Sequence, residues 1–433
     1  MEGLHENGDA LTVTKFMPTL VRPSEKTDNG FYFLSNLDQN IAIIMPMVHC
    51  FKADERKSDN ASEVLKQSLS KVLAHFYPFA SSLTIGSDGK LIVKCTGEGV
   101  QFMEAVANHE IEVLGDITIP KPVTLGKLVH TFPEAKNVLE IPLLTVQVTR
   151  FKCGGFVLGI AMNHCMADGI SAVEFLNSWA ETARGLPLTV PPFLDRAIFR
   201  SRQLPKIEFP HHKFTEIEDV SNITTLYQEQ EIVCRSFCFD EKTLSLLKKL
   251  AMKDGIITNC TNFTLLMALV WRARSKALKM EPHQQTKLLF AINRRSRFDP
   301  PLSKGYFGNA VVLTCCLCSA GELAEKPLAS AVKMVQEAIE LVREDYIRSA
   351  IDYFEVTRAR PSLTGTLLIT TWTRLSFISA DFGWGKARQS GPVTLPEKEV
   401  AAFLPLGKDQ KSINLLLGLP VSAMDIFPEL MKI

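Results

Sequence analysis

The sequence predicts an α/β fold with mixed sheets and two domains. Strand-like and helix-like patterns are interspersed without a strict alternation of strand, helix and strand, which favours mixed sheets over a doubly wound parallel sheet. A length of 433 residues, 46% of them hydrophobic, is enough for two cores. A proline-rich stretch of little periodicity over residues 186–229 separates two regions of regular pattern. It is too long for an ordinary connection within one domain, so we expect it to cross between two.

The first region, residues 1–185, is expected to form the N-terminal domain. Ser62 is typical of a helix N-cap, and Pro78 ends the apolar helical face that follows it. A second helix begins at Gly169 and ends near Arg184 and Gly185. Strand patterns, including a hairpin in the third range, occupy residues 11–16, 41–51, 83–95, 144–151 and 155–162.

The last region, residues 230–433, is expected to form the C-terminal domain. A helix follows Asp240, and Thr261 is typical of the N-cap of another that continues to Leu278. The longest helical pattern of the chain covers residues 327–353. Strand patterns occupy residues 232–239, 287–292, 311–318, 366–371, 399–404 and 412–417.

Composition argues against several classes of function. The net charge is +1 and no long basic run occurs, which argues against a nucleic-acid surface. No apolar run reaches the ~18–20 residues of a membrane span, and the polar N-terminus is unlike a signal peptide, so we expect a cytoplasmic protein. The ten cysteines lack the paired spacing of a metal site. We therefore expect free, mostly buried thiols and no metal.

One stretch carries the most chemistry. The uncharged residues 156–163 read as a buried strand, followed by His164-Cys-Met-Ala-Asp168-Gly169. A neutral imidazole at the exit of an interior strand can accept a proton from a substrate hydroxyl. The spacing of His164 and Asp168 is also a common chance match, and His5 and Asp9 repeat it in the polar N-terminus. A catalytic base and a chance pattern therefore both remain open from this motif alone.

Three further motifs narrow the choice. They are Asp381-Phe-Gly-Trp-Gly385, which alone would read as a tight turn, Tyr306-Phe-Gly-Asn309 and Trp271-Arg-Ala-Arg274. Together with the motif at His164, they resemble the BAHD acyltransferases, plant enzymes that move an acyl group from coenzyme A to an alcohol or amine. The resemblance extends over essentially the whole chain.

The resemblance implies an architecture and partners. It predicts two similar chloramphenicol-acetyltransferase-like domains: residues 1–185 carrying HxxxD, residues 230–433 carrying DFGWG, and a crossover loop over residues 186–229 between them. An active-site channel would lie at the interface, with acyl-CoA as co-substrate and no permanently bound cofactor or metal. A cytoplasmic monomer is expected. The nearest branch is the one that moves feruloyl or caffeoyl groups to fatty alcohols or omega-hydroxy fatty acids, a likeness carried by residues 33–40, 151–158, 349–362 and 395–399.

The resemblance also implies roles for single residues. His164 would be the general base, and the Trp372 indole with the Thr370 hydroxyl would stabilise the oxyanion. Asp168 could orient the imidazole, but the family implies that it points away and pairs with an arginine, for which Arg295 is our candidate.

Asp381 could instead form the ion pair with Arg295. It is commonly grouped with the active site, although the family implies a structural role. For coenzyme A we consider four side chains of the C-terminal domain, which could equally form a solvated helix face: Lys248, Lys249, Thr261 and Arg272.

One position near the base bears on the choice of acceptor. Ala167 stands where relatives acting on fatty acceptors tend to carry phenylalanine, which would widen the pocket beside the base. The first hypothesis is a hydroxycinnamoyl transfer to a long-chain alcohol or omega-hydroxy acid, and the runner-up is an amide-forming N-acyltransferase. A condensation domain of a peptide synthetase is disfavoured because Asn163 replaces its first histidine, and a non-catalytic binding protein is the last alternative.

Overall fold

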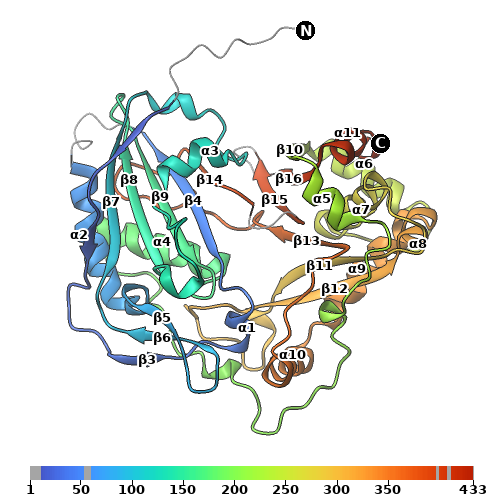
Figure 1. Cartoon of the computed structure of the whole chain (residues 1–433), viewed down its shortest axis with the longest axis horizontal. Helices are drawn as coiled ribbons and strands as arrows, with labels where there is room; N and C mark the ends of the chain where they lie inside the picture. The colour runs from blue at the N-terminus through green and yellow to red at the C-terminus, as the bar shows by residue number, and fades with distance from the viewer. Residues whose placement is uncertain (1–10, 53–59, 396–398, 407–410, 433) are drawn as a thin grey trace.

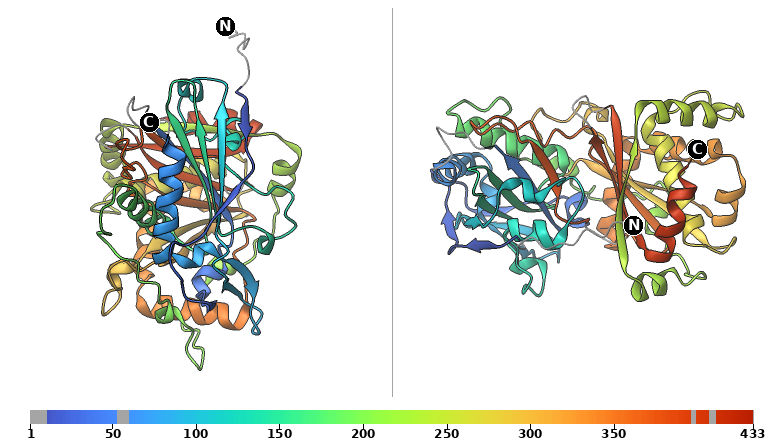
Figure 2. Two further views of the ribbon diagram at one scale, coloured as in Figure 1. Left: turned by 90° about the vertical axis from the view of Figure 1, so that its left-hand side faces the viewer. Right: turned by 90° about the horizontal axis from the view of Figure 1, so that it is seen from above.

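The computed structural model describes residues 11–52, 60–395, 399–406 and 411–432. Two sheets side by side form the two halves of the molecule (Figures 1 and 2). The first sheet has the strand order β1-β7-β8-β9-β4-β14, with β2 also paired to β7. Its strands are β1 (Val13–Lys15), β2 (Thr19–Val21), β4 (Ile44–Phe51), β7 (Val100–Ala107), β8 (Leu144–Arg150), β9 (Phe156–Asn163) and β14 (Gln389–Pro392).

Two long helices cover one face of the first sheet. They are α2 (Ala61–His75) and α4 (Gly169–Ala183), and they share a core with the sheet. The indole N–H of Trp179 on α4 donates to the Leu65 carbonyl at 3.2 Å and to Ser68 Oγ at 3.0 Å on α2. This pairing satisfies the one polar atom of a fully buried side chain.

The other face of the first sheet is covered by irregular chain. Residues 111–129 carry the short helix α3 (Pro122–Leu125) and pack against Val48 and Val157. Glycine is required beneath this segment, because a Cβ at Gly159 would overlap the Leu128 carbonyl. The backbone of the segment thus lies directly on β9, the strand that ends at Asn163, one residue before His164.

The second sheet has the order β10-β16-β15-β13-β11-β12. Each strand pairs antiparallel with its neighbour except that β13 runs parallel to both β11 and β15. The strands are β10 (Ile232–Phe239), β11 (Gln285–Asn293), β12 (Val311–Ser319), β13 (Thr366–Thr371), β15 (Val400–Leu406) and β16 (Ser412–Pro420).

Helices pack on one face of the second sheet and form the largest hydrophobic cluster of the described residues. Successive side chains of each strand point to opposite faces of this sheet. On β13, Leu367 and Ile369 join the core beneath the helices, whereas Leu368 and Thr370 point to the other face. The packed helices are α6 (Glu241–Met252), α7 (Asn262–Ala277), α9 (Leu328–Leu341) and α11 (Val421–Leu430).

A three-stranded sheet and short helices complete the fold. The small sheet has the order β3-β6-β5, and α1 lies beside α10 where the two halves meet. Asn36 on α1 donates to the Ile351 carbonyl of α10 at 2.8 Å. The elements are β3 (Gly30–Tyr32), β5 (Ser82–Ile85), β6 (Leu91–Cys95), α1 (Asn36–Gln39), α5 (Ile223–Glu229), α8 (Ala320–Glu325) and α10 (Glu344–Thr357).

One segment of the later chain returns to the first sheet. Strand β14 pairs antiparallel with β4, so in Figure 1 a reddish strand lies among blue and green ones. A Cβ at Gly391 in β14 would overlap the Ile117 carbonyl, which again shows irregular chain lying directly on the strand. The domain boundary at residue 230 remains a prediction. It assigns β14 to the C-terminal domain, although β14 pairs with β4 of the first sheet.

Several short elements and α11 have no counterpart in the sequence-based expectation, and three longer segments differ from it in an instructive way. The single long helix over 327–353 is two helices, α9 and α10, because Val342 leaves the helical conformation and Arg343 is extended between them. Helix α2 begins at Ala61 with Asn60 at its N-cap, so the N-cap prediction for Ser62 is wrong by two positions. Strand β7 had no predicted counterpart, since its alternation is broken by apolar residues on both faces.

Candidate active site

His164 lies in the turn that follows β9, between the two halves of the chain. Its backbone N–H donates to the Ile43 carbonyl at 2.8 Å, and its carbonyl accepts from the Asn309 amide at 2.9 Å. The residue is half-buried, and Nδ1 is a buried atom with no hydrogen-bond partner among the described residues. The imidazole is therefore held through its backbone and by packing, and no carboxylate of the described residues is bonded to Nδ1.

Asp168 points away from His164. Its carboxylate accepts from Arg295 in a two-pronged ion pair at 2.7 and 2.9 Å, from the Ala310 N–H at 3.0 Å, and from the Ser171 N–H at 3.1 Å as the N-cap of α4. Asp168 is buried, so these bonds offset the cost of removing its charge from water. The predicted pairing of Asp168 with Arg295 is confirmed, and the pair fixes the start of α4 to the chain that leads into β12.

A second buried ion pair holds the turn itself. Arg196, from the crossover segment, lies 3.0 Å from Asp38 on α1, and both side chains are fully buried. The guanidinium also donates to the carbonyls of Cys165 at 3.1 Å and Met166 at 2.5 Å, the two residues after His164. Burial alone would lower the pKa of Arg196, but the Asp38 carboxylate raises it above its usual value. The charge is therefore permanent.

Asn309 joins this ion pair to the histidine. Its side-chain amide donates to Asp38 Oδ1 at 2.8 Å and to the His164 carbonyl at 2.9 Å. The sequence marked residues 33–40 and 306–309 only as family likenesses, and nothing in the local pattern singled out Arg196. Arg196 and Asp38 are 158 positions apart in the chain, so no spacing rule could have paired them.

Thr370 and Trp372 lie at the end of β13 on the face of the second sheet opposite the packed helices. The backbone N–H of Trp372 donates to the Phe403 carbonyl at 2.8 Å, and the indole ring packs on Ala402, Leu404 and Leu416 of the same face. Leu375, three residues later, packs onto Gly169, where a Cβ would overlap its side chain. The loop after β13 is thereby fastened to the first turn of α4, which brings the predicted oxyanion donors to the same side of the molecule as the His164 turn.

Asp381 holds its own turn. It accepts from the N–H groups of Gly383 at 2.8 Å and Gly385 at 2.9 Å, and both glycines have positive φ. Phe382 and Trp384 lie in the core of the first half, with Phe382 edge-on to Trp179 at 5.2 Å. Thus the described contacts of this motif fasten the later chain to the first half, ahead of β14, and none involves His164.

The four residues predicted for coenzyme A lie on α6 and α7, on the helix-covered side of the second sheet. The Thr261 hydroxyl accepts from the Thr264 N–H at 3.1 Å as a helix cap, and Arg272 donates to the Lys326 carbonyl at 2.6 Å. Burial lowers the pKa of Arg272. Lys248 is half-buried and Lys249 is exposed. The structure does not bring this group together with His164.

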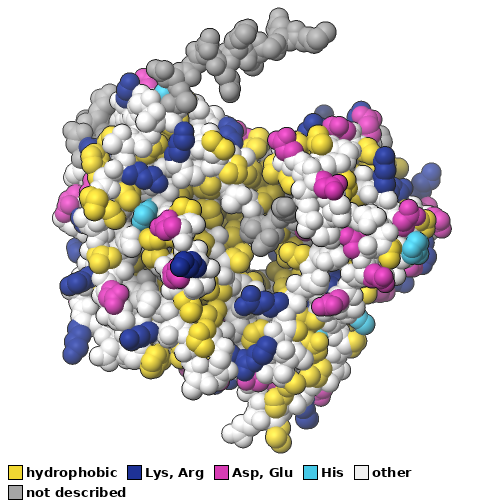
Figure 3. Space-filling model, viewed as in Figure 1, with side chains coloured by type: hydrophobic (Ala, Val, Ile, Leu, Met, Phe, Trp, Pro, Cys, Tyr) yellow, Lys and Arg dark blue, Asp and Glu magenta, His cyan; other side chains and the backbone are white. Residues whose placement is uncertain are grey.

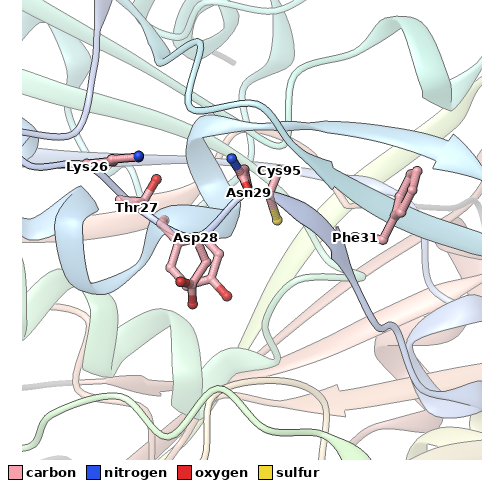
Figure 4. A pocket seen from close by; sticks show the side chains of 7 residues that line it. Lys26, Thr27, Asp28, Asn29, Phe31 and Cys95 are labelled. Carbon is pink, nitrogen blue, oxygen red and sulfur yellow. The ribbon is translucent and has the colours of Figure 1, made fainter.

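The molecule is hollowed between its halves, with hydrophobic side chains inside the hollow (Figure 3). A separate cavity of about 430 Å³ lies beside the three-stranded sheet and is lined by polar and exposed groups (Figure 4). Its thiol, Cys95, has a pKa raised by burial and by Asp28. The cavity therefore holds no activated nucleophile and lies apart from the His164 turn.

Among the described residues, no cluster of three or more His, Cys, Asp or Glu side chains could hold a metal ion. All ten cysteines are free. A membrane-spanning helix is likewise absent from the part of the chain that the structure describes.

A family model described as the Transferase family matches residues 11–432. The chain belongs to this family, that of the BAHD acyltransferases. Two similar proteins of Arabidopsis thaliana are an omega-hydroxypalmitate O-feruloyl transferase, 58% identical over 97% of this chain and 92% of its own, and a fatty alcohol:caffeoyl-CoA acyltransferase, 55% identical over 98% and 99%. The chain is therefore an acyltransferase.

Solved structures agree on the fold. Vinorine synthase superposes with a TM-score of 0.76 at 24% identity, covering 96% of both chains. F. graminearum TRI101 complexed with coenzyme A and deoxynivalenol superposes with a TM-score of 0.73 at 16% identity, covering 92% of this chain and 96% of that one. The predicted α/β fold with mixed sheets is confirmed for this BAHD chain.

Proposed function

We propose that this BAHD acyltransferase moves a hydroxycinnamoyl group, feruloyl or caffeoyl, from coenzyme A to the hydroxyl of a long-chain alcohol or omega-hydroxy fatty acid. Support comes from the two relatives above 50% identity, whose names carry these substrates. Acyl-CoA is a co-substrate that leaves after each turnover. The observation that carries the chemistry is the half-buried imidazole of His164, in a turn whose backbone carbonyl accepts from Asn309 of the other half.

His164 acts as the general base in this proposal. Because Nδ1 is buried, Nε2 is the nitrogen left to accept the proton of the attacking hydroxyl. The hydroxyl oxygen adds to the thioester carbonyl, and the tetrahedral intermediate expels the thiolate of coenzyme A, which takes up the proton. A positioned general base contributes ~10²–10⁴-fold to the rate.

The negative charge on the former carbonyl oxygen needs donors. Thr370 Oγ1 and the Trp372 indole N–H take that role in the proposal, because both residues lie at the end of β13 on the face of the second sheet opposite the packed helices. Loss of one such donor costs ~10²–10³-fold in rate. Asp168, with its bonds to Arg295 and α4, sets the geometry of the turn, and Asp381 sets the geometry of its own.

Coenzyme A is proposed to bind at the second half, with phosphate contacts from Lys248 and Lys249, and with Thr261 and Arg272 as weaker candidates. The cap bond of Thr261 and the carbonyl bond of Arg272 leave those two side chains less available than the lysines.

The test is thiol release from feruloyl-CoA and caffeoyl-CoA with a panel of hexadecan-1-ol, omega-hydroxypalmitate and a small aromatic amine, with products identified by mass spectrometry. We expect ester products and a loss of at least ~10²-fold in kcat for His164→Ala. His75→Ala, an exposed histidine on α2, is the matched control and should keep the wild-type rate. Amide products alone, or an active His164→Ala enzyme, would overturn the proposal.

A further inference from the structure

One face of the second sheet carries none of the α-helices that the structure describes, and we call it the open face. On β12, Val312 and Cys316 pack under the helices, while Leu313, Cys315 and Leu317 alternate onto the open face and are half-exposed. Aliphatic side chains that remain half-exposed on an interior sheet face indicate a surface that an apolar ligand can cover.

The open face leads away from the proposed catalytic centre. Because β12 is antiparallel to β11 and β13 is parallel to it, the strand ends at Val311, Asn293 and Thr371 lie at one edge of the sheet. Asn309, which bonds the His164 carbonyl, comes two residues before that edge. The opposite edge carries Leu317, paired with Lys287 on β11. From Val311 to Leu317 the strand rises about 20 Å at ~3.3 Å per residue.

The crossover segment closes the far edge. Lys287 Nζ donates to the carbonyls of Lys213 at 3.3 Å and Thr215 at 2.7 Å, and Ile217 packs at Gly365 just before β13. Lys213 Nζ donates to Tyr346 Oη at 3.1 Å and lies 3.1 Å from His211 Nδ1. Two buried lysines, Lys213 and Lys287, therefore stand at the far edge. We call them the far lysine pair.

The far lysine pair has no carboxylate partner among the described ion pairs. Both residues are at least 97% buried, and burying an ammonium without a counter-charge is costly. Each ammonium has three donors, and two at most are used by the contacts above. Cys315, half-exposed on the open face, is close enough for both charges to act on its thiol. The pair thus adjoins the surface that leads to the catalytic edge.

We propose that the far lysine pair binds the terminal carboxylate of an omega-hydroxy fatty acid, whose chain lies along the open face and whose hydroxyl reaches His164. This inference rests on the proposed function and deepens it, because it selects the hydroxy acid over the plain alcohol as the preferred acceptor. The two named relatives differ in this respect.

Length and charge both fit this acceptor. One extended fatty chain spans about half of the ~30 Å hydrocarbon core of a bilayer, which matches the open face once head groups are added at both ends. The apolar middle of the face suits the methylene groups. Among the described residues, the only buried lysine or arginine side chains along this face are Lys213 and Lys287, and they lie where the second head group would be. A carboxylate there would supply the counter-charge that the lysines lack.

The test compares three acceptors of one length: omega-hydroxypalmitate, its methyl ester and hexadecan-1-ol. Wild-type enzyme should favour the acid over the methyl ester by about tenfold or more in kcat/KM, the size of a charge-assisted hydrogen bond. In Lys213→Met and Lys287→Met this preference should fall to within about twofold, mainly through KM for the acid. Lys71→Met, an exposed lysine on α2, is the matched control and should keep the full preference.

Each outcome is decisive. Equal use of the acid and the methyl ester by the wild type, or lysine variants that lose both in proportion, would overturn the inference and leave the proposed function standing. No transfer to any of the three acceptors would instead overturn the proposed function. Because each acid rate is divided by the methyl-ester rate of the same preparation, a partly misfolded variant does not imitate the expected result.

Discussion

Replacing Arg196 by methionine should destabilise the enzyme strongly and disable it. The methionine fills similar space but removes the guanidinium that pairs with Asp38 and donates to the carbonyls of Cys165, Met166 and Phe307. All of these groups are buried.

The expected loss of stability follows from the buried groups that lose their partner when the guanidinium is removed. Removing one partner of a buried ion pair costs ~3–5 kcal/mol. Asp38 keeps the N–H and hydroxyl of Ser35 at 2.6 and 2.7 Å and the Asn309 amide at 2.8 Å, which reduces the penalty at the carboxylate. The three carbonyls that lose their guanidinium donor increase the loss of stability, by ~1–3 kcal/mol for each that does not bond to water instead. We therefore expect a loss of about 3–5 kcal/mol.

The assay is urea unfolding followed by tryptophan fluorescence, since Trp179 is buried in the same half. Arg196→Lys should recover part of the loss, because it restores the charge but not the several directed donors. In a double-mutant cycle with Asp38→Asn, the double variant should lose about 1–3 kcal/mol less stability than the sum of the two single losses. Kcat should fall in Arg196→Met even under conditions where the protein is folded, because the chain after His164 has lost its anchors.

Arg235→Met is the matched control, as Arg235 and Asp425 are exposed and 4.0 Å apart. It should change stability by less than about 0.5 kcal/mol. A loss below about 1 kcal/mol for Arg196→Met, or strict additivity with Asp38→Asn, would refute the view that this pair holds the turn.

Three other predictions follow from single contacts. Asp168→Asn should destabilise the fold by about 3 kcal/mol through the stranded Arg295, and the shape of the pH–rate profile of the remaining activity should not change; a displaced profile would point to a triad. Gly391→Ala should abolish soluble expression by overlapping the Ile117 carbonyl, whereas Gly126→Ala, whose Cβ would meet Val393 at 3.9 Å, should express normally. Burial lowers the pKa of Lys213 from 10.5 to about 7, so the unfolded chain holds the extra proton between these values and stability rises with pH across them. Lys213→Met should therefore raise the melting temperature most below pH 7, with the gain shrinking toward pH 10; a pH-independent gain would contradict this.

The sequence predicted well those elements whose pattern is local. Strands β10 and β13 match their predicted bounds, because apolar or β-branched runs between turn signals need no distant partner to be recognised. The prediction of one helix over residues 327–353 was wrong because the apolar period continues through the break. The bend at Val342 and Arg343 depends on what α10 meets: Asp352 accepts from Arg202, and Tyr346 from Lys213, both in the crossover segment. Such contacts are invisible to periodicity.

The residues of the candidate site also differ in whether a local sequence pattern could reveal them. His164 and Asp168 could be found from five consecutive residues after a buried strand, and Arg295 could be named as the partner of Asp168 only through the family likeness. Arg196 could not be found at all, because its role exists only where α1, the crossover segment and the His164 turn meet. A turn that carries a base has few backbone bonds of its own, so its position must be fixed by groups from elsewhere. Charged groups suit this task because a buried charge without its partner is costly, which favours one arrangement of the turn over others. Whether that arrangement is needed for transfer, beyond stability, is what the kcat of folded Arg196→Lys decides: wild-type kcat at reduced stability would confine the pair to folding.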